Sequence, residues 1–396
     1  MASDGADSQR LLHGRQNSHQ SPADGADGFE DDNLVAPQSL YNNVGASFQR
    51  DLHSADWGIF SSMKIVLFKS KLNFLIPCGF LAILINYISQ NQGWVFPLSL
   101  LGIIPLAERL GFATEQLGLF TGRTAGGLLN ATFGNATELV ISIHALRSGK
   151  LRVVQQSLLG SILSNTLLVL GCAFFGGGLS CGKTEQGFRK EDAVLNFGLL
   201  LMAVMGLVSP AMLYYTHTEG VGRDQGDDDY EYAYPEISKW EAIAWLAIFT
   251  AWISVFSDFL VDAIEGASKA WNIPIAFIST VLLPIVGNAA EHASAVMFAM
   301  KDKLDISLGV AIGSSTQISM FVIPFSVVTG WMMGQPMDLN FHLFETASLL
   351  ITVLVVAFLL QDGTSNCFKG LMLILCYLIV AASFYVYADP NLDDGV

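Results

Sequence analysis

Residues 134–138 read Gly-Asn-Ala-Thr-Glu, and residues 287–291 repeat this pattern as Gly-Asn-Ala-Ala-Glu. Each copy lies inside a long apolar run, and each places one carboxylate, Glu138 or Glu291, where a lipid-spanning helix should have none. Charged side chains at such depth are costly, and they mark ion or proton pathways. The two motifs therefore predict a transport site inside a membrane.

The spacing of 153 residues between the two motifs continues beyond them. Lys150-Leu151 matches Lys303-Leu304 at this spacing, and Gly160-Ser161 matches Gly313-Ser314. An internal repeat that carries intramembrane carboxylates is typical of secondary transporters, whose two halves enclose the site at their interface. The expected fold class is an all-α polytopic membrane protein with an inverted repeat.

The composition supports a membrane location. The chain of 396 residues is 52% hydrophobic and 14% charged, whereas soluble proteins carry about 25% charged residues. Its apolar residues fall in blocks of roughly 20, the length that crosses a bilayer. The net charge of −15 argues against nucleic acid as a partner, and the five scattered cysteines form neither a disulfide framework nor a zinc motif. The lipid membrane is the expected partner.

The polar residues 1–62 contain no apolar signal core, so they predict a disordered tail, with a regulatory role as the narrower alternative. Basic residues before the first apolar block favour a cytosolic N-terminus. Ten spans are expected, at residues 72–89, 94–120, 124–146, 151–178, 193–216, 239–262, 273–300, 304–331, 341–360 and 368–387. The expected parts are the tail, a first span within 63–92, a first transport repeat of four spans at 93–216, an acidic loop at 217–238, a second transport repeat of five spans at 239–387 and a C-terminal tail at 388–396.

Helical periodicity brings the polar residues of each motif to one face. Asn135 and Glu138 lie three residues apart, as do Asn288 and Glu291, so each pair forms a stripe. Calcium binds six to eight oxygen atoms, which two facing stripes and water molecules could supply. Further hydroxyl and amide oxygens are expected from the next helices, at Ser161, Ser164, Ser314, Ser315 and Gln317.

A pair of buried carboxyls also explains a coupling to protons. Burial favours the neutral form of a carboxyl, and a second carboxyl nearby strengthens this preference, so protons are held when no cation is bound. A divalent cation competes with these protons, and exclusive occupancy combined with alternating access gives obligatory antiport. His292 beside Glu291 is a candidate for proton sensing or gating, with an ordinary hydrogen-bonding role as the alternative.

Two further acids match at a spacing of 150 residues, Glu108 and Asp258. Glu108 lies well inside its apolar run and could line a cation path, or it could form an ion pair with the adjacent Arg109. The acidic loop at 217–238 is either a solvated linker or a weak collector of divalent cations, because massed carboxylates raise the local cation concentration.

The two motifs resemble those of the cation/proton exchanger (CAX) family, which is part of the calcium/cation antiporter superfamily. The segments Pro105-Leu106-Ala107-Glu108-Arg109 and Asp302-Lys303-Leu304-Asp305-Ile306 support the resemblance, which extends over residues 64–387. It implies an antiporter of the vacuolar membrane that moves calcium, and often manganese, against protons. It implies no cofactor besides the transported ions, and a homodimer and regulatory proteins bound to the tail are the further partners considered.

By this resemblance, Glu138 and Glu291 are the central cation and proton carboxylates, with His292 assisting. Asn135 and Asn288 complete the motif positions. Glu108, Asp258 and the serine and glutamine residues named above are supporting positions.

The family pattern is one span followed by two repeats of five spans, eleven in all, whereas the first repeat here has four spans. An even number of crossings between the two motif helices would orient the repeats alike, and facing motifs need an odd number. Ten spans also divide the basic residues poorly between the two sides, and one more crossing improves the division. A splice variant or faulty gene model that lacks one helix is the simplest hypothesis, and a shifted or re-entrant span is the alternative.

Other functions fit less well. A sodium/calcium exchanger or a passive cation channel would use the same carboxylates, and a chain that lacks one helix could be inactive. No enzyme is expected, because the sequence contains no His-Glu-x-x-His helix for an intramembrane zinc hydrolase.

Overall fold

The computed structural model describes residues 59–121, 123–180, 185–213 and 235–387. The expected C-terminal tail and nearly all of the expected N-terminal tail and acidic loop lie outside the described residues. The first described helix, α2 (Ile59–Phe68), begins inside the range that the sequence assigned to the N-terminal tail. A short 3-10 turn, η1 (Lys71–Leu75), leads into α3 (Ile76–Ile88), and the two form the first candidate span.

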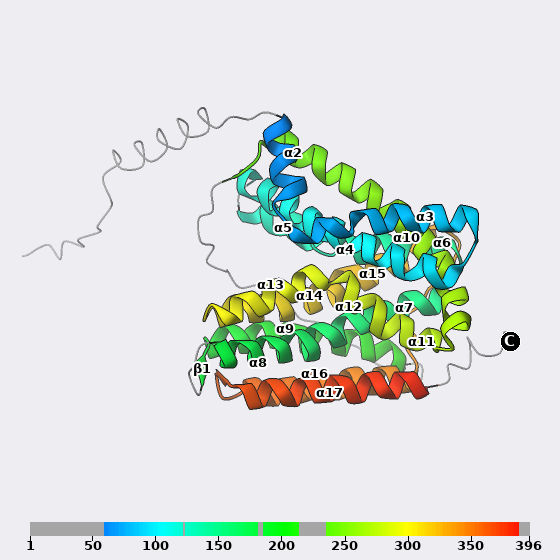
Figure 1. Cartoon of the computed structure of the whole chain (residues 1–396). Coiled ribbons are helices and arrows are strands. Elements are labelled where there is room, and N and C mark those ends of the chain that lie inside the picture. The colour runs from blue at the N-terminus through cyan, green and yellow to red at the C-terminus, as the bar shows by residue number, and fades with distance from the viewer. Residues whose placement is uncertain (1–58, 122, 181–184, 214–234, 388–396) are drawn as a thin grey trace, which may run out of the picture. The chain divides into compact units, whose positions relative to one another are not determined.

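Two long helices, α4 (Gln92–Thr121) and α10 (Lys239–Trp271), lie along each other, and α3 packs against α4 (Figure 1). Small residues permit this close packing. A Cβ placed on Gly79 of α3 would meet the ring of Phe256 in α10, and one on Gly102 of α4 would lie 2.6 Å from Gly79 itself. Helices in lipid associate through such close contacts at glycine.

The remaining helices belong to the two repeats. The first repeat continues with α5 (Arg123–Phe133), α6 (Ala136–Arg147), α7 (Leu151–Leu163), η2 (Ser164–Val169), α8 (Leu170–Ser180) and α9 (Lys190–Leu213). The second continues with α11 (Ile275–Phe277), η3 (Ile278–Leu282), α12 (Leu283–Gly287), α13 (Ala289–Met300), α14 (Leu304–Gln317), η4 (Ile318–Val322), α15 (Ile323–Met332), α16 (Leu343–Leu360) and α17 (Cys367–Val386). Two short antiparallel strands, β1 (Gln186–Gly187) and β2 (Thr364–Ser365), join the repeats.

Among the described residues, eight helices are long and apolar enough to cross a membrane, and the bent pair at residues 275–287 and 289–300 raises the number to nine. The all-α polytopic fold is therefore confirmed. The third expected span does not meet this measure, because α5 reads Arg-Thr-Ala-Gly-Gly-Leu-Leu-Asn-Ala-Thr-Phe and contains few large apolar residues.

Both Gly-Asn motifs interrupt a helix in the same way. Asn135 has φ −103° and ψ 21°, and Asn288 has φ −96° and ψ 13°, so each residue precedes a new helix. At the second break the two helix axes differ by 58°. Discontinuous helices of this kind present backbone ends and side chains to an ion within the membrane.

The segments η2 and η4 are π-helical, and they follow α7 and α14 at nearly matching positions of the two repeats. Such single-turn widenings of an α-helix are frequent at functional sites. The two segments share no sequence pattern that would predict them: η2 reads Ser-Asn-Thr-Leu-Leu-Val and η4 reads Ile-Ser-Met-Phe-Val.

Candidate functional site

Glu138 and Glu291 occupy the same place in their two helices. Each lies in the first turn, Glu138 in α6 and Glu291 in α13, shortly after the break at Asn135 or Asn288. The free N–H groups at a helix N-terminus favour a negative charge. The interrupted backbone therefore stabilises a carboxylate at a depth where lipid opposes it.

The structure brings the two motifs together. A Cβ added to Gly287 would lie 4.0 Å from Oε1 of Glu138, and Glu138 and Glu291 are close enough for their charges to interact. Glu138 is 8% exposed, and Asn135 and Asn288 are also buried. Two carboxylates from different repeats thus meet in the interior of the helical bundle.

Two side-chain hydrogen bonds join the repeats near the carboxylates. Nδ2 of Asn135 donates to Oε1 of Gln317 at 2.8 Å. Nε2 of His292 lies 3.1 Å from Oδ1 of Asn165, which belongs to the first repeat. Asn135 of the first repeat is thus bonded to the residue directly before η4 in the second repeat. His292 of the second repeat is bonded to η2 in the first repeat.

The two carboxylates differ in their partners. Oγ of Ser314 donates to Oε2 of Glu291 at 2.8 Å. Oε1 of Glu138 and Nδ2 of Asn288 are buried and have no hydrogen-bond partner among the described residues. An unsatisfied buried polar group costs about 1–3 kcal/mol. A cation or a proton bound at Glu138 would offset part of that cost, so the arrangement suits a carboxylate that exchanges ligands.

Other predicted oxygen ligands are buried, but their hydroxyl groups donate within their own helices. Oγ of Ser164 donates to the carbonyl oxygen of Ser161 at 3.1 Å, and Oγ of Ser315 donates to that of Ala311 at 2.9 Å. A hydroxyl that donates in this way keeps its lone pairs as acceptors. In the part of the chain that the structure describes, no three His, Cys, Asp or Glu residues gather to hold a metal ion. A cation would therefore depend on two carboxylates and neutral oxygens.

Glu108 and Asp258 form pairs of their own. Glu108 accepts a hydrogen bond from Oγ of Ser70 at 2.6 Å and forms an ion pair with Arg109 at 2.6 Å. Asp258 lies 3.0 Å from Nδ1 of His144, at the end of α6. The structure therefore favours the ion-pair interpretation of Glu108, and both acids have partners outside the two motifs.

Asn165 lies near the site and is not among the predicted site residues. His292 was predicted from its place beside Glu291, and the counterparts of His292 and Asn165 at a spacing of 153 residues are Leu139 and Ile318. Because both counterparts are apolar, the His292–Asn165 bond between the repeats has no repeat-related equivalent. The signal that could have found Asn165 was a buried amide inside an apolar run.

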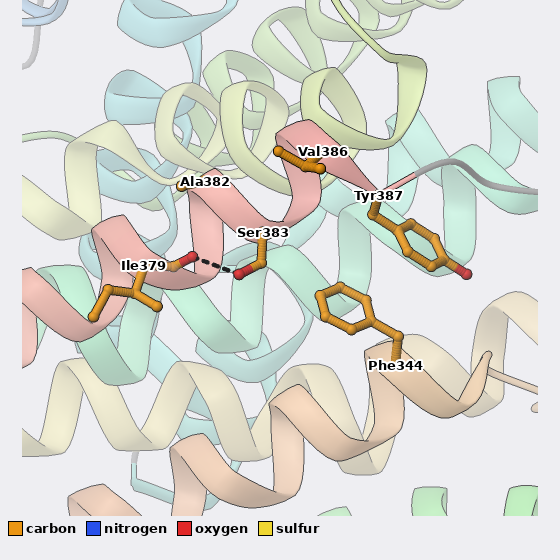
Figure 2. Close-up of a pocket in the computed structure, with 6 residues that line it drawn as sticks. All are labelled: Phe344, Ile379, Ala382, Ser383, Val386 and Tyr387. Carbon is orange, nitrogen blue, oxygen red and sulfur yellow. Dashed lines mark hydrogen bonds between the residues drawn. The ribbon is translucent and has the colours of Figure 1, made fainter.

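Two apolar pockets lie in the described part of the chain. Figure 2 shows the first, where Phe344 of α16 faces the end of α17; the hydroxyl of Ser383 there donates to the carbonyl oxygen of Ile379 at 2.8 Å. The second lies beside His292, between α8 and α13. Among the described residues that line them, neither pocket contains a carboxylate, and the first has no residue of the candidate site.

Comparison with known proteins identifies the family. The sequence model of the family described as sodium/calcium exchanger protein matches residues 92–249 and 241–386. Vacuolar cation/proton exchanger 5 of Arabidopsis thaliana is 62% identical over 397 residues, which cover 89% of each chain. The chain belongs to the cation/proton exchanger family. A protein of Oryza sativa subsp. japonica named putative vacuolar cation/proton exchanger 4 is 64% identical over 414 residues, and the alignment covers 91% of each chain.

A solved structure shows the fold of the exchanger family. Native YfkE superposes with a TM-score of 0.68 and 33% sequence identity, and the match covers 80% of this chain and 100% of YfkE. A second structure of that protein, substituted with selenium, names it a Ca2+/H+ antiporter. This match confirms the predicted transporter fold. The vacuolar relatives and the candidate spans together support the predicted location, a multi-pass protein of the vacuolar membrane.

Two features of these matches concern the number of spans in this exchanger-family chain. The alignment of 414 residues is longer than the whole chain of 396 residues, so the Oryza relative contains residues that this chain lacks. The two family matches overlap at residues 241–249, so the match to the first repeat runs into α10, the first helix of the second repeat. Neither feature says where in the chain the extra residues of the relative fall, so the missing span stays a prediction.

Proposed function

We propose that the chain is a secondary antiporter that exchanges a divalent cation, calcium first and manganese second, for protons across the vacuolar membrane. The observation that carries the proposal is the meeting of Glu138 with the second motif at Gly287. The names of the relatives, vacuolar cation/proton exchangers, and the description of YfkE as a Ca2+/H+ antiporter support the choice of ions.

Charge neutralisation couples the two ions. A divalent cation is balanced by two ionised carboxylates, whereas the empty site is balanced when protons neutralise Glu138 and Glu291. The site therefore holds either the cation or protons. If only these neutralised forms allow the protein to change its access from one side to the other, each cation that moves one way requires protons to move the other way.

Neighbouring side chains position the carboxylates for this exchange. Ser314 donates to Glu291 and so stabilises its ionised form, which the cation requires. The bond from Asn135 to Gln317 holds the first motif against α14. His292, hydrogen-bonded to Asn165, assists by fixing the orientation of α13.

Calcium uptake into sealed vesicles with an imposed pH gradient tests the function. We expect uptake that a protonophore abolishes, and no uptake by Glu138→Gln or Glu291→Gln, because an amide keeps the shape but cannot carry the negative charge. Asp362→Asn is the matched control, since Asp362 is a 71% exposed carboxylate that pairs with Lys369 outside the site.

Three results would point elsewhere. Uptake that persists without a gradient indicates a passive channel, and uptake driven by a sodium gradient indicates a sodium/calcium exchanger. No uptake by the unaltered chain, together with uptake by the Arabidopsis relative in the same vesicles, indicates that the missing span makes this chain inactive.

A further inference from the structure

The starts of α7 and α14 lie at opposite faces of the membrane. The 30-residue span of α7, η2 and α8 crosses from one face to the other. Shortly after its end, the backbone N–H of Arg189 donates to Oδ1 of Asp305 at 2.7 Å, so the start of α14 lies beside the end of this span. We call the face at the start of α14 the first face and the face at the start of α7 the second face.

The helix α5 also lies at the first face. Lys150, directly before α7, pairs with Glu265 near the end of α10, so this end of α10 lies at the second face. The start of α4 lies beside it, because a Cβ on Gly93 would be 3.0 Å from Cβ of Ala270. The 30-residue helix α4 then crosses the membrane, and α5 follows its end.

At the second face, the two repeats are closed against each other. The segment α11 and η3, which follows the end of α10, packs against α7. Its residues 278–281 are buried. A Cβ on Gly160 of α7 would collide with the backbone carbonyl oxygen of Thr280. The approach of η3 to α7 is therefore so close that only glycine fits at position 160.

At the first face, the described residues form no equivalent contact. The repeat spacing of 153 residues pairs Gly160 with Gly313 of α14, and it pairs Thr280 with Gly127 of α5. A Cβ on Gly313 or on Gly127 would meet no atom within 4 Å. The helix α5 packs against α4 instead, where a Cβ on Gly126 would lie 3.1 Å from the carbonyl oxygen of Gly118.

The exposure of the matching segments differs in the same sense. Leu128 of α5 is 70% exposed, whereas its counterpart Val281 in η3 is 6% exposed. In α7, residues 153–163 are all buried. In α14, one stripe is exposed or half-buried, formed by Ile306, Gly309, Val310, Gly313, Thr316 and Gln317. This open stripe runs from the first face to Gln317, the partner of Asn135 in the candidate site.

We propose that this conformation is open to the first face, and that in the opposite conformation α5 moves from α4 onto α14 and Gly127 closes against Gly313. The two repeats then exchange roles, as the symmetry of an inverted repeat allows. The segment η3 leaves α7, and α5 takes the place on α14 that η3 now has on α7. This gate rests on the antiport function proposed above, because only alternating access requires the second conformation.

A side chain at position 313 would act on one of the two conformations only. The backbones of two helices approach this closely only where a residue lacks a Cβ. In the open conformation the new Cβ of Gly313→Ala meets no atom within 4 Å, so the variant should fold normally. In the closed conformation the same Cβ would collide with the carbonyl oxygen of Gly127. Gly313→Ala should therefore hold the protein open to the first face.

Calcium uptake by two alanine variants tests the gate. We expect uptake by Gly313→Ala to fall at least about fivefold, because overpacking disfavours the closed conformation by this factor or more. The matched control is Gly309→Ala, one turn earlier on the same open stripe, whose new Cβ also meets no atom within 4 Å. Its counterpart is Gln156, which has a side chain, so no close approach of backbones is expected there. Equal melting temperatures would show that both variants fold.

Labelling of a single cysteine measures the conformation without transport. Val310 is half-buried on the open stripe, whereas its counterpart Ser157 is buried. In open membrane fragments, Val310→Cys in a chain with the native cysteines replaced should react with a charged maleimide, which reaches only thiols in contact with water. Adding Gly313→Ala should raise the labelling rate up to about twofold, because two equally populated conformations become one. Adding Gly160→Ala should slow the labelling, because η3 can no longer close on α7.

The outcomes separate the gate from the proposed function. No labelling of Val310→Cys without further substitutions would show that the stripe faces lipid, and the proposal would be wrong. The same labelling rate and the same uptake for Gly313→Ala and Gly309→Ala would also overturn it. Faster labelling with Gly313→Ala in a chain that takes up no calcium even when unaltered would support the gate and contradict the antiport function alone.

Discussion

Ser314→Ala removes the side-chain hydrogen bond that the described residues make to Glu291. Oγ of Ser314 donates to Oε2 of Glu291 at 2.8 Å, and the substitution leaves the helix and the packing of α14 almost unchanged. A hydrogen bond to a charged group contributes about 1.5–3 kcal/mol, and about 1.4 kcal/mol corresponds to a tenfold change in an equilibrium constant. Because Glu291 is only partly buried, we expect the lower end of this range.

The expected result is a rise of about tenfold in the calcium concentration that gives half-maximal uptake. Initial uptake rates at a fixed pH gradient measure it over a series of calcium concentrations. The control is Ser319→Ala, which removes a buried hydroxyl of the same bundle that donates to the carbonyl oxygen of Ser315 at 2.8 Å. If Ser314→Ala and Ser319→Ala have the same half-maximal concentration while Glu291→Gln is inactive, then the serine does not support the ionised carboxylate.

Two predictions concern stability. Gly134→Ala should lower the free energy of unfolding by about 1–3 kcal/mol, because the new Cβ would lie 2.5 Å from a backbone carbonyl oxygen. The control Gly111→Ala should not lower it, because no atom lies within 4 Å of its Cβ. Equal melting temperatures of the two variants in detergent would refute the close approach at Gly134. Arg152→Gln should cost about 3–5 kcal/mol by leaving the buried Glu345 unpaired. The control Arg189→Gln breaks an exposed ion pair with Asp192, in which Arg189 is 64% exposed, and should cost at most about 1 kcal/mol. If thermal melting shows the same loss of stability for Arg152→Gln and Arg189→Gln, burial of the ion pair does not determine the cost.

The apolar blocks were sufficient to predict most of the spans, and the repeated motif predicted that the segments around Glu138 and Glu291 would meet, as they do at Gly287. An intramembrane acid is costly, so two such acids in matching contexts are informative even without coordinates. The expected span at 239–262 ends nine residues before the helix α10 does. The helix continues to Trp271, since Ala263, Ile264 and Ala267 keep one face buried and Asn272, with φ 52°, ends it.

Other features could not be predicted from a repeat. The break in the third span is a change of backbone angles at one residue. A mean hydropathy over about 20 residues contains no information on such angles, so it could not predict the break. His292 was predicted from its place beside Glu291, but its contact with Asn165 was not, because the repeat-matched counterparts of the two residues are Leu139 and Ile318. The pairing of Asp258 with His144 depends on how α6 and α10 pack, which sequence spacing does not specify.

The hydrogen bond between His292 and Asn165 has a consequence for the relative free energies of the inward-open and outward-open states. In a transporter made of two identical inverted halves, exchanging the halves exchanges the inward-open and outward-open states, so the two states have equal free energy. A bond between the halves that has no repeat-related equivalent removes this degeneracy. A single hydrogen bond of about 0.5–1.5 kcal/mol shifts such an equilibrium by roughly two- to tenfold. We therefore expect the contact between His292 and Asn165 to shift the balance between the inward-open and outward-open states when no ion gradient is present.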